Sequence, residues 1–506
     1  MTDLRRNFYL TLGGITLLKL LLAAWLPLTG DEAYFFVWGR HPGLGYYDHP
    51  PMVGWWLHAL LYLGQAEWWL RLPAYAMTSF IAWAIYRLLR DGLGEERAAL
   101  AGLLYLLAPV NVINVLISTD TPLILLSFLS ALALQRALQR DGWRWFAYSG
   151  ALLGLAFLAK YFAVLLGLAY GAYLLLVRPS RRNAVGLLLL FLAVLPFAAL
   201  NLWWNYCHCW DNVLFNVYSR HSGSSFDWTH PALYLLMLVY LVTPPLLWQA
   251  WRRRGAVLDA LRGRGLFLWL WLLPMALFAL LSFTARIGLH WVLAFYPFLF
   301  LFLPSVLDAA QLRRSVRFMA WFSLLHVAAI AVLLALPTDA WQGRPVLHHD
   351  MVFGRYSGEF WQQIEPQLDG HALATESYVY SAILEHRSGR RFHVFGDASK
   401  YGRQDDMLTD YRALDGKDIA VLLYAAKSPA VHARYFESHE VQEITVRGVT
   451  DYLLLGRGFR YTLYRDEVLR RTQQQFYRLP WFLPAGACYF YDKYFPDEDV
   501  QRLPRG

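Results

Sequence analysis

Residues 29–56 read TGDEAYFFVWGRHPGLGYYDHPPMVGWW, and this stretch separates the first long apolar segment of the chain from the next. Asp31 and Glu32 follow that segment directly, and the apolar residues after them can lie at a membrane interface as a helix. A glycine-rich bend then leads to Pro50 and Pro51, which can begin a second interfacial helix. The stretch indicates a membrane protein with acidic and aromatic residues gathered at one surface.

The composition of the whole chain agrees with this interpretation. Of its 506 residues 57% are hydrophobic and 16% are charged, against about 25% charged in an ordinary soluble domain. These values exclude a disordered chain, a small disulfide scaffold and a simple soluble enzyme. A net charge of +9 would suggest nucleic-acid binding in a soluble protein, but in a membrane protein it can reflect topology alone.

Apolar segments long enough to cross a bilayer recur along the first two thirds of the chain. The first is predicted to be an uncleaved anchor, because it is long for a signal peptide and lacks a small-x-small cleavage site. The sequence predicts eleven spans, at about residues 8–28, 68–88, 98–117, 121–137, 146–159, 161–177, 184–204, 231–251, 266–284, 289–307 and 317–336.

Basic residues are distributed unequally between the two sets of connections. One set holds nineteen arginines and the other holds five basic residues, which are Arg40, Arg71, Lys160, Arg220 and Arg286. The positive-inside rule therefore places the N-terminus in the cytoplasm and everything after about residue 337 outside. Most of the positive charge is thus a topology signal, and no nucleic-acid partner is expected.

Residues 337–506 differ from the rest, with 21 basic and 23 acidic residues. Short β-like runs predict strands at 391–396, 418–424 and 439–447. Helices are predicted near 357–368, 377–388 and 428–438. We therefore expect a polytopic α-helical membrane domain, residues 1–336, followed by a soluble α/β domain, residues 337–506, on the periplasmic side.

All three cysteines, Cys207, Cys209 and Cys488, fall on the outer side in this topology. Cys207-His208-Cys209 lacks the two-residue gap of usual zinc sites, so an unligated pair in a loop is favoured. An oxidising compartment would allow a disulfide from either cysteine of the pair to Cys488.

Seven carboxylates are predicted on the outer side of the membrane part, several of them just where a span ends. Asp31 and Glu32 could merely cap the helix that they begin. Asp120, in the turn Ser118-Thr119-Asp120-Thr121-Pro122, is predicted on the same face of the membrane. Its presence there favours a functional role for these carboxylates over helix capping alone. Two carboxylates from separate loops at one membrane depth can supply a general base and an orienting group.

Basic residues are scarce on the predicted outer face, so each one there is a candidate for binding a substrate. Lys160 ends the fifth predicted span. It could extend its ammonium group to the membrane surface without any functional role, or it could bind a phosphate, and the sequence favours neither explanation. Several cations at the outer ends of apolar spans are suited to bind the phosphate of a lipid-linked substrate. The candidates are Lys160, Arg220, Arg286 and His290, with His49 in addition.

These motifs resemble a known family. Asp31-Glu32 after the first span and Tyr46-Tyr47-Asp48-His49-Pro50-Pro51 later in the loop resemble the polyprenyl-phosphate-sugar glycosyltransferases of the GT-C fold. More narrowly, they resemble the branch of lipid A aminoarabinose and galacturonic acid transferases, related to protein O-mannosyltransferases. Asp120 in Thr-Asp-Thr-Pro and Lys160 in Leu-Ala-Lys-Tyr are similar to positions in the same family.

The resemblance implies transfer of a sugar from a polyprenyl phosphate to an acceptor on the periplasmic face of the bacterial inner membrane. Asp31 would be the general base, with Glu32 beside it and Asp120 orienting a substrate, and Asp48 matches a position that binds a divalent ion in some relatives. His49 stands where aminoarabinose transferases have a lysine. The implied donor-binding residues are Tyr46, Tyr47, His49, Lys160, Arg220, Arg286 and His290.

The residue types suit this chemistry. A carboxylate can take the proton of the attacking hydroxyl, and cations or a metal can neutralise the leaving phosphate. Because phosphate leaves readily, inversion without a covalent intermediate is expected, which fits the lack of a Walker motif. The expected acceptor is lipid A or another envelope lipid, with a protein hydroxyl second.

Two other classes of function compete with transfer. A transporter or flippase of a lipid-linked sugar or small solute would keep its charges near the bilayer midplane, whereas here, apart from Lys19, they lie at span ends. A sensor that binds envelope glycans would use aromatic residues for stacking, but interfacial aromatic belts explain these residues equally well. Catalysis is therefore the favoured prediction.

Overall fold

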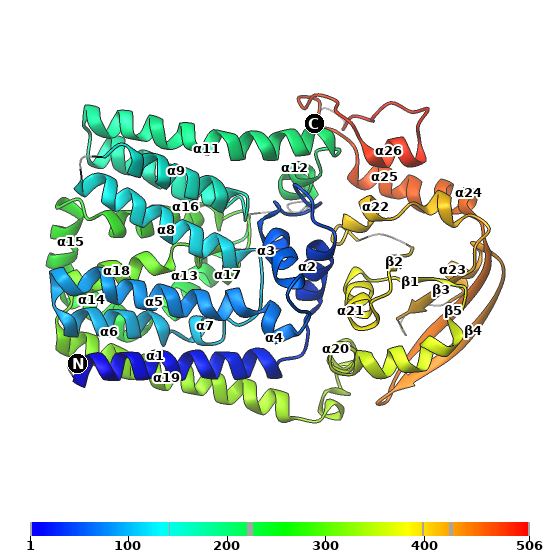
Figure 1. The fold of residues 1–506 in the computed structure, drawn as a ribbon, viewed down its shortest axis with the longest axis horizontal. Helices are drawn as coiled ribbons and strands as arrows, with labels where there is room; N and C mark the ends of the chain where they lie inside the picture. The colour runs from blue at the N-terminus through cyan, green and yellow to red at the C-terminus, as the bar shows by residue number, and fades with distance from the viewer. Residues whose placement is uncertain (1–2, 141, 220–225, 397–398, 425–428, 504–506) are drawn as a thin grey trace. The chain divides into compact units, whose positions relative to one another are not determined.

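The computed structural model describes residues 3–140, 142–219, 226–396, 399–424 and 429–503, and most of its elements are helices (Figure 1). The chain forms two compact units, each assembled from three segments. The first unit contains residues 1–26, 63–199 and 223–335, and the second contains residues 27–62, 200–222 and 336–506.

Most helices of the first unit coincide with the apolar segments of the sequence, and the helix Arg181–Cys207 continues into the second unit from residue 200. They include α1 (Asp3–Trp25), α4 (Glu67–Leu70), α5 (Leu72–Leu93), α6 (Glu95–Leu106), α7 (Pro109–Val112), α8 (Asp120–Gln139), α9 (Arg144–Phe157), α10 (Ala163–Ala172) with a π-helical turn (Tyr173–Val177), α11 (Arg181–Cys207), α13 (Thr229–Val242), α14 (Pro244–Arg252), α15 (Arg254–Arg262), α16 (Leu266–Leu281), α17 (Leu289–Val292), α18 (Tyr296–Val306) and α19 (Ala309–Ala335). Several of the long helices run alongside one another in Figure 1.

The spans are less regular than the sequence predicts. By length and composition, four helices of the described chain can cross a membrane, namely α1, α8, α11 and α19, or up to six if each of two bent pairs counts as one span. The predicted span at 231–251 is bent by 84° between α13 and α14. The bend occurs because Thr243 has a φ of +69° and Pro244 follows it. The predicted span at 289–307 is likewise divided into α17 and α18.

Buried cations of the first unit are satisfied by groups on neighbouring helices. Lys19 of α1 donates a hydrogen bond to the Thr78 hydroxyl of α5, which accounts for a lysine inside an apolar helix. Arg71 is fully buried and donates from Nη1 to the carbonyl oxygens of Ala23 and Leu26 at 2.7 and 2.8 Å. It therefore satisfies carbonyl groups that the end of α1 leaves unpaired.

The second unit is built around a five-stranded mixed sheet in the order β2-β1-β3-β5-β4. Parallel pairing joins β1 to β2 and β3, and antiparallel pairing joins β5 to β3 and β4. The strands are β1 (Ala372–Thr375), β2 (Phe392–Val394), β3 (Ile419–Leu423), β4 (Phe436–Val446) and β5 (Val449–Phe459).

Helices of the second unit pack around this sheet and along the chain before and after it. They include α2 (Gly30–Arg40), α3 (Met52–Leu61), α12 (Asp211–Val213) with a π-helical turn (Leu214–Ser219), α20 (Pro345–Ile364), α21 (Tyr378–Ser388), α22 (Gln404–Leu408), α23 (Ala430–Ala433), α24 (Tyr461–Tyr464) with a π-helical turn (Arg465–Leu469), α25 (Arg470–Phe476) and α26 (Tyr489–Tyr494), and short 3-10 turns at Thr338–Trp341, Glu365–Gln367 and Tyr411–Leu414.

The predicted α/β pattern of the C-terminal segment is confirmed in part. All three predicted strands are present, and the predicted helix at 377–388 matches α21. The helix predicted at 428–438 is wrong over most of its length, because α23 spans only Ala430–Ala433 and β4 begins at Phe436. Strands β1 and β5 were not predicted, since neither shows a clear alternation of apolar and polar residues.

Residues 27–62 and 200–222 belong to the second unit rather than to the first. The sequence-based division at residue 336 placed both segments in the membrane part. They differ because α2 packs against α21: a side chain at Gly30 would meet Val379, and Arg40 donates to the Glu385 carbonyl at 3.0 Å. The loop after the first span is thus part of the C-terminal unit.

A disulfide joins Cys209, just after α11, to Cys488, just before α26. It selects between the two pairings that the sequence allowed, and Cys207 keeps a free thiol. The turn at Cys209 and Trp210 is strained, because both have positive φ values, 54° and 59°. The Cys209 amide also donates to the Ala487 carbonyl at 3.1 Å, so the strained turn is held at both its backbone and its side chain.

Candidate functional site

The candidate residues fall into two groups, one in each unit, and each group is described by itself. The second unit contains Asp31, Glu32, Tyr46, Tyr47, Asp48 and His49. The first unit contains Asp120, Lys160, Arg286 and His290. Arg220 lies outside the residues that the structure describes.

Glu32 closes a capping box at the start of α2. Its Oε2 accepts hydrogen bonds from the Thr29 hydroxyl at 3.1 Å and the Thr29 amide at 3.4 Å, and its own amide donates to the Thr29 hydroxyl at 3.4 Å. The side chain is buried. The helix-capping explanation considered for the acidic pair therefore holds for Glu32.

Asp31 differs from its neighbour, because its side chain is exposed to solvent. Desolvation by the surrounding protein, and then the charge of Glu32, raise the pKa of Asp31 above its ordinary value. Burial, and then the charges of Asp31 and Asp48, raise the pKa of Tyr378, so its hydroxyl lies near both carboxylates. An accessible carboxylate with a raised pKa is suited to accept a proton.

Tyr46 and Tyr47 are fully buried and support the loop. The Tyr46 ring stacks on Trp38 with centroids 4.4 Å apart, and its hydroxyl donates to the Trp38 carbonyl at 3.0 Å. The Tyr47 amide donates to Gln404 Oε1 at 2.8 Å. These contacts attach the loop to the C-terminal segment, and a donor-binding role for either tyrosine stays a prediction.

Asp48 and His49 follow these anchors. Asp48 is buried, and its backbone carbonyl accepts a hydrogen bond from Asn216 Nδ2 at 3.2 Å. The half-buried His49 ring lies with its centroid 6.0 Å from that of Trp38. No group of three or more His, Cys, Asp or Glu side chains among the described residues is placed to hold a metal ion. A divalent ion at Asp48 stays a prediction, and no step is assigned to a metal.

In the first unit, Asp120 and Lys160 form a buried ion pair. Lys160 Nζ lies 2.8 Å from each carboxylate oxygen of Asp120, and the two side chains are 6% and 11% exposed. Asp120 is the first residue of α8, where negative charge is favoured, and Lys160 follows the end of α9. The structure thus brings together two candidates that lie 40 residues apart in the chain.

Aromatic residues adjoin this ion pair. Lys160 Nζ lies 5.5 Å from the centre of the Phe162 ring, which is 4.8 Å from that of Trp291 in α17. His290, the neighbour of Trp291, is exposed, as is Arg286. A cation held beside aromatic rings is suited to bind a phosphate at the edge of an apolar region.

Sequence reasoning missed the residues that hold the first loop in place. Tyr378, Gln404 and Asn212 contact or approach the loop from segments more than 150 residues away. Asn212 Nδ2 donates to the Tyr46 carbonyl and, at 3.0 Å, to the Tyr47 carbonyl. None carries a local sequence signal, because each acts through long-range hydrogen bonds or charge interactions.

Comparison with known proteins supports the assignment of the fold. Residues 48–204 match the family of dolichyl-phosphate-mannose-protein mannosyltransferases. The lipid A galacturonosyltransferase RgtD of Rhizobium johnstonii is 30% identical over 281 residues, which are 53% of this chain and 58% of that protein. The chain thus matches less than two thirds of the length of this relative.

Among solved structures, ArnT from Cupriavidus metallidurans in the apo state superposes with a TM-score of 0.62 at 15% identity, covering 89% of this chain and 98% of ArnT. The oligosaccharyltransferase AglB from Archaeoglobus fulgidus superposes with a TM-score of 0.44 at 13% identity, covering 89% of this chain and 74% of AglB. The predicted GT-C fold and the resemblance to GT-C glycosyltransferases are confirmed.

Proposed function

We propose that this GT-C protein is an inverting glycosyltransferase of the bacterial inner membrane. It moves a sugar from a polyprenyl-phosphate carrier to a hydroxyl or phosphate of an envelope acceptor on the periplasmic face. Lipid A is the first acceptor to test, because a lipid A galacturonosyltransferase is among the relatives. A protein hydroxyl is the second, because the matched family model describes protein mannosyltransferases.

The observation that carries this proposal is the state of Asp31. It is an exposed carboxylate with a raised pKa, held on a capped helix, in a chain with the fold of ArnT. Glu32 and the aromatic packing around Trp38 fix the helix from which Asp31 projects. A general base held in a fixed position needs little rearrangement when the substrate binds, so the free-energy cost of positioning it is small.

Each candidate group has a role in the transfer. Asp31 takes the proton from the acceptor oxygen as that oxygen bonds to the anomeric carbon. The bond from the anomeric carbon to the phosphate oxygen breaks, and the electron pair leaves with the phosphate. In the first unit, Lys160, with His290 and Arg286 as further cations, is suited to stabilise the negative charge of a phosphate. Asp120 keeps the Lys160 ammonium group in position through the 2.8 Å ion pair.

The experiment that tests the proposal combines cells with the purified protein. Mass spectrometry of envelope lipids and proteins, with and without the gene, is expected to reveal one lost sugar mass. The purified protein, given polyprenyl-phosphate galacturonic acid and lipid A, is expected to add that mass to the acceptor. Unchanged envelope lipids and proteins, together with movement of labelled lipid-linked sugar across vesicles, would instead establish a transporter.

Replacing Glu32 with glutamine is expected to move the acidic limb of the pH profile of kcat/KM to lower pH. Asp31 works as a base only when ionised, so activity falls as the pH drops through its pKa. Because the Glu32 charge raises that pKa, its removal lowers the pKa and keeps Asp31 ionised in more acidic solution. The pH dependence of transfer by the purified variant measures the shift.

The matched control is Glu32→Ala. Glutamine can still accept the hydrogen bonds from Thr29, whereas alanine loses them, at a cost in the free energy of unfolding on the order of 1 kcal/mol. Thermal unfolding should therefore distinguish the two variants. A folded Glu32→Gln protein without transfer at any pH would contradict a purely structural role and show that the Glu32 carboxylate also acts in the reaction.

A further inference from the structure

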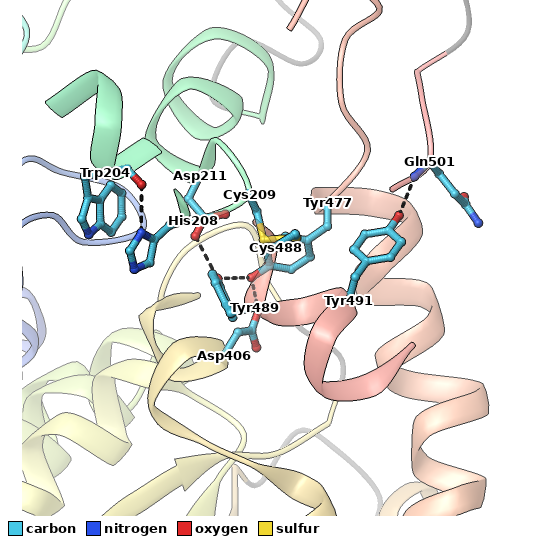
Figure 2. Close-up of a disulfide and its surroundings, with 10 residues drawn as sticks. All are labelled: Trp204, His208, Cys209, Asp211, Asp406, Tyr477, Cys488, Tyr489, Tyr491 and Gln501. Carbon is cyan, nitrogen blue, oxygen red and sulfur yellow. Dashed lines mark hydrogen bonds between the residues drawn. A yellow bond between two sulfur atoms is a disulfide. The ribbon is translucent and has the colours of Figure 1, made fainter. Parts of the chain in front are cut away.

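A buried chain of hydrogen bonds lies beside the disulfide of the second unit (Figure 2). Asp211 Oδ2, at the start of α12, is 2.8 Å from the Tyr489 hydroxyl. That hydroxyl is 2.9 Å from the Tyr477 hydroxyl, which is 2.7 Å from Asp406 Oδ2. Two carboxyl groups from distant segments are thus connected through two phenols, and all four side chains are buried or nearly so.

The number of protons in this chain can be counted. Three hydrogen bonds join its four oxygen atoms, and each hydrogen bond needs one proton. The two phenols supply one proton each. If both carboxyl groups were ionised, one of the three contacts would have two lone pairs facing each other. One carboxyl group must therefore be protonated for the chain to be complete.

The surroundings favour Asp211 as the protonated group. Arg403 Nη2 donates to Asp406 Oδ1 at 3.0 Å in a buried ion pair, so Asp406 has a cation to stabilise its charge. Within the described residues, no Lys, Arg or His lies at ion-pair distance from Asp211, and its Oδ1 is buried without a hydrogen-bond partner. Burial, and then the charge of Asp406, raise the pKa of Asp211 well above its ordinary value.

The position of Asp211 matters because its neighbour holds the first loop. Asn212 donates to the carbonyl groups of Tyr46 and Tyr47, and Asn216, one turn later, donates to the carbonyl of Asp48. The proton-sharing chain and the disulfide fix the start of this segment on the C-terminal part of the unit. A displacement of α12 would therefore move the backbone that carries Asp48.

We propose that Asp211 is a positioning residue that works in its neutral, protonated form. Asp211 Oδ2–H donates to Tyr489, Tyr489 donates to Tyr477, and Tyr477 donates to the ionised Asp406. This chain holds α12 in place, and α12 holds the loop with Asp48. Its link to sugar transfer rests on the proposed function, whereas the protonation of Asp211 does not.

Other titratable groups face this chain and bear on its pH dependence. Besides the members of the chain and Arg403, they are Tyr47 of the first loop, His208 just after α11, Asp405 of α22, Tyr464 of α24, and Lys493 and Tyr494 of α26. Burial lowers the pKa of His208. Lys493 donates to the carbonyl groups of Asp406, Met407 and Thr409, and thus adds positive charge on the Asp406 side.

The test compares Asp211→Asn with Asp406→Asn in the full-length protein in detergent. Asparagine resembles a protonated aspartate and can donate to Tyr489, so Asp211→Asn should melt at the wild-type temperature at acidic pH. A raised pKa in the folded state gives stability that is lost as the pH rises through that pKa. Wild type should therefore lose stability as the pH rises from the ordinary aspartate pKa through the raised pKa of Asp211, and Asp211→Asn should lose less. Asp406→Asn should melt lower at every pH, because Arg403 is left unpaired.

Infrared spectroscopy gives a direct readout of the proton. Wild type should show a protonated carboxylic acid band that Asp211→Asn lacks and that the exposed-site control Asp369→Asn keeps. In the transfer assay, Asp211→Asn should keep kcat within about twofold, whereas Asp211→Ala should lose up to about 10²-fold in kcat with KM little changed.

The outcomes separate the two ideas. An unchanged infrared band in Asp211→Asn, or equal pH dependence of melting in that variant and wild type, would overturn the protonated state. If Asp211→Asn loses the infrared band as expected but Asp211→Ala keeps the wild-type kcat, the positioning role is wrong. If wild type itself transfers no sugar, the proposed function fails, while melting and infrared data still report on Asp211.

Discussion

Sugar transfer is expected to fall by about 10²- to 10⁴-fold when Asp31 is replaced by asparagine. The amide has the shape of the carboxylate but cannot take the proton of the acceptor. Asp31 is exposed, and the described part of the chain offers its carboxylate no hydrogen bond or salt bridge, so the fold should be unaffected. Initial rates of transfer and thermal unfolding of the purified variant measure the two expectations.

Asp369→Asn is the matched control, because it changes an exposed carboxylate of the same unit. It should leave both transfer and unfolding at wild-type values. Retained transfer in Asp31→Asn would remove Asp31 as the base and direct attention to Asp48, whose charge also acts on Tyr378. Loss of transfer together with loss of the folded state would show that Asp31 is structural.

Removing either charge of the Asp120–Lys160 pair is expected to lower the free energy of unfolding by about 3–5 kcal/mol. Both side chains are buried, so Asp120→Asn removes the carboxylate that lies against the buried ammonium group, and Lys160→Met removes the ammonium group that lies against the buried carboxylate. The double variant removes both charges and should recover much of this loss. Thermal unfolding in detergent measures the three proteins side by side.

Transfer should behave differently from stability in this series. If Lys160 stabilises the leaving phosphate, the double variant stays poorly active even though its stability recovers. Arg253→Gln is the control, since it breaks an exposed pair with Asp308 in the same unit and should cost at most about 1 kcal/mol. Wild-type transfer in the double variant would exclude a role for Lys160 in the reaction.

Local pattern predicted the elements that depend on local burial. Every apolar segment identified in the sequence is helical at least in part, and the short apolar run in residues 418–424 correctly predicted β3. Local pattern failed where a backbone bends or a strand lacks alternation. The break at Thr243 depends on a positive φ that no pattern of apolar residues reveals.

The sequence identified the residues of the candidate site but not the contacts that they make. Charged residues beside apolar segments are costly without partners, so Asp31, Glu32, Asp120 and Lys160 were identifiable from the sequence. The sequence did not show which of these residues form an ion pair, which cap a helix and which remain exposed. Glu32 caps α2 and Asp120 pairs with Lys160, whereas Asp31 remains exposed to solvent.

The sequence by itself therefore determined a polytopic helical chain of the GT-C type with acidic and basic candidates for transfer. Hydrophobic periodicity and charge are local quantities, and they suffice to identify the apolar helices and the charged candidates, whereas the GT-C type came from the resemblance of the first-loop motifs to a known family. Only the tertiary structure decided that the first loop and residues 200–222 belong with the C-terminal segment, and which cysteine pairs with Cys488. These contacts join residues more than 150 positions apart through single hydrogen bonds and one disulfide, which no local pattern encodes.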